Sequence, residues 1–185
     1  MRPHAASADG SGGASTSGKP RRRLAETISQ ALPPLFPTIG GALLWGLAMG
    51  GSALATLVLA QWETPYNIRV VVVLFAIGGA IAFPFGLFLA RLLSTAGRRE
   101  TAFAAMLLSL AIVTIAATSG LFALQYRSYY AEWHAEAFSR IWFLQFIHTV
   151  AAAAYQFAVL GLRLYSPFGF VALLAASAWF ARRAR

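Results

Sequence analysis

The chain has 185 residues and a net charge of +9, with 58% of its residues hydrophobic and only 11% charged; its mean hydropathy is +0.63. Soluble domains carry about 25% charged residues, and a chain this short has no interior that could hide several long apolar runs from water. The composition therefore excludes a soluble globular domain, and the lack of cysteine excludes disulfides, thiol catalysis and iron–sulfur clusters.

A polar segment precedes the apolar part of the chain. Residues 1–23 are rich in Gly, Ser and Ala and end in three arginines, which predicts a disordered basic tail. Residues 24–34 predict a juxtamembrane segment on the inner membrane surface or a plain basic linker, and Pro33 and Pro34 stop any helix there. The apolar run that follows is much longer than the about 7–15 apolar residues of a signal peptide, so we interpret it as a retained anchor.

Four apolar runs predict an all-α integral membrane protein, built as a four-transmembrane-helix bundle within residues 35–181. The predicted spans cover residues 35–60, 70–90, 102–124 and 141–162. Each is long enough to cross about 30 Å of hydrocarbon at about 1.5 Å per residue. After a break at Ser166-Pro167, residues 168–181 are apolar but short for a span. We interpret them as a docked, interfacial or re-entrant segment, with a fifth membrane span as the alternative.

Arginine clusters border the apolar runs at residues 21–23, 91–99 and 182–185. This distribution is typical of positive-inside topology signals rather than of nucleic-acid binding. It places the N-terminus in the cytoplasm, and a fifth span would put the last arginines outside. Fourteen arginines against one lysine favour a GC-rich bacterial genome. The sequence thus predicts a multi-pass inner-membrane protein that contacts the lipid bilayer and no nucleic acid.

The predicted outer loop, residues 125–140, has the pattern of an amphipathic helix lying on the outer face of the membrane. Its aromatic residues share one helix face, with the spacing i, i+3, i+4, i+7: Tyr126, Tyr129, Tyr130 and Trp133. Such side chains suit the lipid interface, and they are also favoured anchors of protein interfaces. Both interpretations stay open at this point.

The fourth predicted span carries a polar stripe. Six residues fall within one arc of the helix: Gln145, His148, Thr149, Tyr155, Gln156 and Arg163. Because polar groups need partners in hydrocarbon, we expect this stripe to face other helices or a wet cavity. It predicts either interhelical hydrogen bonds or a site for a proton, a cofactor or a polar ligand. His148 is the only ionisable residue deep within a predicted span, which disfavours haem ligation by two histidines.

Small residues repeat every four positions in the first two spans. The first stripe is Ala42, Gly46 and Gly50, and the second is Gly78, Ala82 and Gly86. Such stripes let helix backbones approach closely in a membrane. They predict that the first two spans pack against each other within the chain, with self-association or docking on another membrane protein as the alternative.

The chain lacks the acidic residues and metal ligands that membrane enzymes generally need at membrane depth. Its one aspartate lies in the tail, every glutamate lies in the N-terminal region or a loop, and no HExxH, GxSxG or phosphate-binding glycine loop is present. We therefore predict no catalytic site, metal site or bound cofactor. The predicted function is a non-catalytic accessory, assembly or scaffold subunit that packs against other membrane protein subunits or itself. The alternatives are a small transporter or channel along the polar stripe, and a haem- or quinone-binding protein built around His148.

Overall fold

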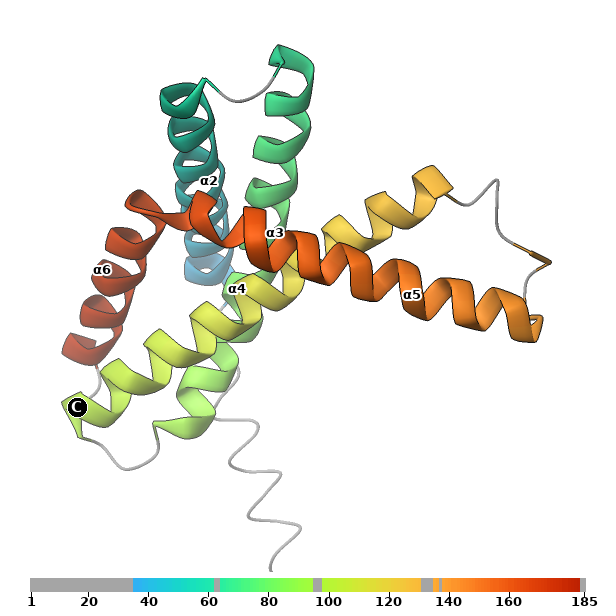
Figure 1. Ribbon diagram of the computed structural model, residues 1–185. Helices are drawn as coiled ribbons and strands as arrows, with labels where there is room; N and C mark the ends of the chain where they lie inside the picture. Colours follow the sequence, from blue (N-terminus) through green and yellow to red (C-terminus); the bar gives the residue numbers. More distant parts are fainter. Residues whose placement is uncertain (1–34, 62–63, 95–97, 131–134, 137, 184–185) are drawn as a thin grey trace, which may run out of the picture. The chain divides into compact units, whose positions relative to one another are not determined.

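The computed structural model describes residues 35–61, 64–94, 98–130, 135, 136 and 138–183, and these ranges contain helices and no strand (Figure 1). The predicted tail, the juxtamembrane segment and Trp133 lie outside the described residues. The elements in chain order are α2 (Leu35–Ala60), α3 (Pro65–Leu93), α4 (Arg99–Tyr130), α5 (Arg140–Gln156), the π-helical turn η3 (Phe157–Gly161), the 3-10 turn η4 (Leu162–Tyr165) and α6 (Phe168–Arg183).

Four of the described helical runs are long and apolar enough to cross a membrane, which confirms the prediction of a helical chain with four candidate spans. They are Leu35–Ala60, Pro65–Leu93, Arg99–Tyr129 and Arg140–Tyr165. The second and third extend beyond the predicted apolar runs, because a helix continues into polar residues until a signal stops it. α3 begins at Pro65, whose missing N–H loses no hydrogen bond at the first helical position.

The prediction of a separate surface helix over residues 125–140 is wrong. Residues 125–130 are the last turns of α4, and the described part of 131–139 is not helical. No glycine or proline lies between Leu121 and Tyr130, so nothing ends the hydrogen-bond ladder of α4 where its apolar run ends. Ser139 then begins α5, since its hydroxyl accepts a hydrogen bond from the backbone N–H of Trp142 at 3.1 Å.

Two clusters of buried side chains form the core. The first joins α2, α3, α4 and α6 and includes Trp45, Met49, Phe83, Leu87, Met106, Leu110 and Phe180. The second joins α2 and α3 to the η turns and includes Leu57, Leu74, Phe75, Phe157 and Leu164. α6 packs on α4 and α2, so the segment after the Ser166-Pro167 break is docked on the other helices.

The small-residue stripe of α2 packs on α3, as predicted. A Cβ atom built on Gly46 would lie 2.7 Å from the carbonyl oxygen of Ala76 in α3, and one built on Gly50 would lie 3.0 Å from the Ala76 Cβ. No side chain larger than hydrogen fits at Gly46 without moving the two backbones apart. These glycines are therefore used inside the chain.

The small-residue stripe of α3 faces α4 instead of α2, and the expectation that the two stripes meet is wrong for α3. A Cβ on Gly86 would lie 3.1 Å from the Cα of Leu110 in α4, one on Gly78 would lie 2.9 Å from the Cα of Thr118, and Ala82 is fully buried. α3 packs between two neighbours, and each neighbour needs a face of small residues. The face of α3 that packs on α2 is formed by other residues, such as Gly79.

Candidate functional site

The structure divides the polar stripe of the fourth predicted span. Gln145 and Thr149 are half-buried and bonded within the chain. The Gln145 Oε1 accepts from the backbone N–H of Ala135 at 2.9 Å, and the Thr149 hydroxyl donates to the Gln145 carbonyl at 2.7 Å. Arg163 is exposed on η4, beyond the π-helical turn that changes the angular register of the helix.

The remaining members of the stripe, His148, Tyr155 and Gln156, are exposed on α5, and Tyr155 has 71% of its surface accessible. His148 and Tyr155 thus have no described helix of this chain over them, whereas Gln156 lines a cleft. α5 contacts the rest of the chain through its other side, where Ala153 and the adjoining Phe157 are buried.

The contacting side of α5 is aromatic, which explains this orientation. The ring centroid of Phe157 lies 5.9 Å from that of Phe75 in α3 and 6.1 Å from that of Phe122 in α4. Nearer the start of α5, the guanidinium of Arg127 lies 5.5 Å from the centre of the Trp142 ring. Ring packing and cation–π contact thus decide which side of α5 faces the bundle.

Opposite this contacting side, α5 presents an exposed row of residues in alternating steps of three and four. We call it the α5 seam, and it consists of Ile141, Leu144, His148, Ala151 and Tyr155, all of them exposed. The spacing is that of a helix–helix interface, in which small residues admit a neighbouring backbone and larger ones fill its grooves. No described helix of this chain covers the seam.

A cleft of about 670 Å³ lies between α3, α4 and the η3 turn. Its wall is largely apolar, with Phe157 packed against Phe75 and Phe122. Polar side chains also line it, and they are Asn67, Gln125, Tyr126, Tyr129 and Gln156. None of the described residues around the cleft carries a charge. Two tyrosines that the sequence placed on a surface helix, Tyr126 and Tyr129, therefore line a cleft from α4.

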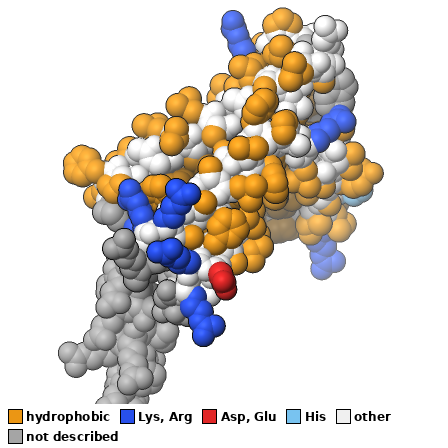
Figure 2. All heavy atoms as spheres, turned by 90° about the vertical axis from the view of Figure 1, so that its left-hand side faces the viewer, with side chains coloured by type: hydrophobic (Ala, Val, Ile, Leu, Met, Phe, Trp, Pro, Cys, Tyr) orange, Lys and Arg blue, Asp and Glu red, His pale blue; other side chains and the backbone are white. Residues whose placement is uncertain are grey.

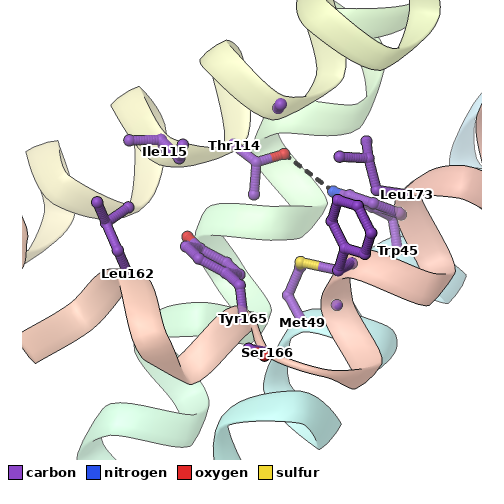
Figure 3. Close-up of a pocket in the computed structure, with 11 residues that line it drawn as sticks. Trp45, Met49, Thr114, Ile115, Leu162, Tyr165, Ser166 and Leu173 are labelled. Carbon is purple, nitrogen blue, oxygen red and sulfur yellow. Dashed lines mark hydrogen bonds between the residues drawn. The ribbon is translucent and has the colours of Figure 1, made fainter.

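A smaller cavity of about 290 Å³ lies among α2, α4, η4 and α6 (Figure 3). The Trp45 indole N–H donates to the Thr114 hydroxyl at 3.1 Å beside it, and the Tyr165 hydroxyl is buried next to Thr118. Small-molecule sites commonly occupy about 300–1,000 Å³. The larger cleft falls well within this range, whereas this cavity lies at its lower limit.

Two hydroxyl groups of α2 hold the break between η4 and α6. The Ser52 Oγ donates to the Leu164 carbonyl at 2.9 Å and accepts from the Gly169 N–H at 3.1 Å. The Thr56 Oγ1 lies 3.0 Å from the Ser166 carbonyl oxygen. A helix break leaves backbone groups without helical partners, and these hydroxyls satisfy them away from water. Sequence reasoning missed both residues, whose only signal was a pair of hydroxyls one turn apart in an apolar run.

The predicted site residues thus fall into separate places. His148 and Tyr155 lie together on the α5 seam, Gln156 lies at the cleft with the two tyrosines of α4, and the small-residue stripes are used inside the chain. Two features remain exposed, namely the seam and the cleft. No family model, curated protein or solved structure matches the chain, so the interpretation rests on this geometry.

Proposed function

We propose that this chain is a non-catalytic accessory subunit of the inner membrane that docks a transmembrane helix of a larger membrane complex on the α5 seam. One observation carries the proposal: the interface-like spacing of the seam lies opposite the side by which α5 packs on its own chain. A helix that packs on its own chain by one side, and has the spacing of a helix–helix interface on the other, is suited to join two helix bundles.

Lipid alone is a poor occupant for the seam. His148 and Tyr155 lie about two turns apart on it, and hydrocarbon offers them no hydrogen-bond partner. A neighbouring helix offers side chains and carbonyl groups, and an interhelical hydrogen bond in a membrane contributes about 0.6–2 kcal/mol. Ala151 lies between the two polar residues and lets a second backbone approach.

A different protein suits the seam better than a second copy of this chain. In a parallel symmetric pair, His148 would meet His148 and Tyr155 would meet Tyr155, so that like groups would face each other. An unrelated helix can place an acceptor opposite the tyrosine hydroxyl and a carbonyl or carboxylate opposite the imidazole. Partner choice is then a matter of complementary polar groups along an otherwise apolar interface.

The test is native mass spectrometry of the tagged chain, gently solubilised from its own membrane. Ala151→Phe places a ring in the middle of the seam, and we expect partner recovery to fall about tenfold, which corresponds to about 1.4 kcal/mol of binding free energy. Ala116→Phe, at another exposed alanine in α4, is the matched control and should keep the partner.

Docking on the seam is wrong if both variants keep the partner or both lose it. If the chain formed only a homodimer, and Ala151→Phe disrupted it, the seam would mediate self-association instead of docking on a larger complex.

The cleft supports a second candidate function, the binding of a small neutral molecule dissolved in the membrane, as in the quinone-binding alternative. Its volume of about 670 Å³ suits a ligand of drug size. Its phenylalanine rings can stack on a planar ring, and the carboxamides of Gln125 and Gln156 can donate hydrogen bonds to ring oxygens. The uncharged lining favours a neutral ligand over an ionic one.

A short-chain benzoquinone is the probe for this candidate, with binding measured in nanodiscs by equilibrium partitioning. Leu160→Trp fills the cleft and should reduce binding about tenfold or more. Val159→Trp, one residue away and exposed on the surface, should leave it unchanged. Equal binding by all three proteins, or none by the unmodified chain, removes this candidate and leaves the α5 seam proposal untouched.

A further inference from the structure

Three helix ends meet at one end of the bundle, and that of α6 is distant in sequence from the other two. Ala90 near the end of α3, Ala102 in the first turn of α4 and Ala181 near the end of α6 belong to the same buried cluster. The arginines next to these alanines therefore lie at one end, which we call the arginine end: Arg91, Arg98, Arg99, Arg182 and Arg183. Figure 2 shows basic side chains gathered at one end of the described helices, below an apolar surface.

The arginine end is strongly unbalanced in charge. Glu100 is the one acidic residue beside these arginines in the described part of the chain, which leaves an excess of four positive charges. Arg91, Arg182 and Arg183 lie in the last turns of α3 and α6, where they also complement the helix dipoles. Helix dipoles supply only partial negative charges, so most of the excess remains to attract an anion.

We propose that the arginine end binds the phosphate group of an anionic phospholipid in the adjacent leaflet. Guanidinium groups hold phosphate oxygens through paired, charge-assisted hydrogen bonds. The Arg183 guanidinium lies 4.3 Å from the centre of the Trp179 ring, and tryptophan prefers the interfacial layer where head groups lie.

The surface next to the arginines can bind an acyl chain of the lipid. Ala175, Ala178 and Trp179 of α6 border a groove that opens beside Arg182 and Arg183. An acyl chain can lie along these apolar side chains while its phosphate rests on the arginines. This combination of apolar groove and cationic rim distinguishes a lipid from a soluble anion, which would use the arginines alone.

The test is native mass spectrometry of the full chain after equilibration with phosphatidylglycerol and phosphatidylcholine, with free glycerol phosphate as a competitor. The unmodified chain should retain phosphatidylglycerol in preference to phosphatidylcholine. Arg182→Gln with Arg183→Gln should lose about 25-fold in that preference, since each arginine near an anionic surface contributes about fivefold. Arg182→Lys with Arg183→Lys should restore most of it, which separates loss of charge from loss of folding.

The matched control is Arg69→Gln with Arg140→Gln, which removes two exposed arginines from the starts of α3 and α5. It should keep the lipid preference. Equal retention of phosphatidylglycerol by the unmodified chain and the Arg182, Arg183 variant overturns the proposal, as does an equal loss in the control. Displacement of the lipid by millimolar glycerol phosphate would assign the site to soluble phosphate and overturn the lipid assignment.

Discussion

α3 and the run that contains α5 are both apolar enough to cross a membrane, yet they differ in how they join the rest of the chain. In the most apolar stretch of α3, 44% of the residues are buried, against 11% in the run that contains α5. α3 has close glycine contacts on two sides and packs between α2 and α4. α5 packs by one aromatic side and leaves its seam exposed.

This difference shows that apolar character does not decide which helices pack in a membrane. Lipid tails are as apolar as leucine, so close backbone approach and hydrogen bonds provide the selectivity. α5 also carries small residues, but Ala151 lies on its exposed side. The same rule that packs α3 inside the chain supports the proposal that a helix from outside the chain packs on the exposed side of α5.

The largest expected effect comes from breaking the close approach of α2 and α3. Gly46→Leu forces a side chain against the Ala76 carbonyl, and we expect it to lower the free energy of unfolding by about 3 kcal/mol. Gly51→Leu is the control, because nothing lies within 4 Å of a Cβ at that exposed glycine. Unfolding by sodium dodecyl sulfate in mixed micelles measures both, and equal midpoints would contradict the packing described for α2.

A smaller effect is expected from removing the Ser52 hydrogen bonds at the break between η4 and α6. Ser52→Ala leaves the Leu164 carbonyl and the Gly169 N–H without their partner, which should cost about 1–3 kcal/mol. Ser177, buried in α6, can be replaced by cysteine as a reporter, since the chain has no other. Maleimide should label this cysteine faster in the Ser52→Ala background. Ser119→Ala, which removes an exposed hydroxyl of α4, should not change the labelling rate.

The Trp45–Thr114 hydrogen bond, which joins α2 to α4, should contribute about 1 kcal/mol. A double-mutant cycle of Trp45→Phe and Thr114→Val isolates this coupling from the loss of ring and methyl packing. Unfolding midpoints of the four proteins provide the measurement. A coupling energy near zero would mean that α2 and α4 are held together only by their apolar contacts.

The smallest effect on folding is expected on the α5 seam itself. Leu144 is 70% exposed, so Leu144→Ala should change the free energy of unfolding of the isolated chain by less than about 0.5 kcal/mol. Ala153→Leu, on the contacting side, should destabilise by about 1–3 kcal/mol because Ala153 is fully buried. If Leu144→Ala proved the more destabilising, the two sides of α5 would be reversed.

The sequence by itself determined where the helices lie along the chain. The predicted span 35–60 coincides with α2, the break at Ser166-Pro167 separates η4 from α6, and the contact of Gly46 and Gly50 with α3 follows from their spacing. These features depend on local properties, namely run length, a helix breaker and the absence of a side chain. Each acts on its own stretch of chain or on the next helix.

Only the tertiary structure decided which side of each helix is used. The orientation of α5 depends on ring contacts with Phe75 and Phe122. The position of the break between η4 and α6 depends on a hydrogen bond from Ser52, which is 112 residues from Leu164. The meeting of the arginines at one end likewise depends on how α6 packs against α4 and α2. In an apolar medium, polarity patterns leave the rotation of a helix about its axis open, and contacts between distant rings, hydroxyls and backbones determine it.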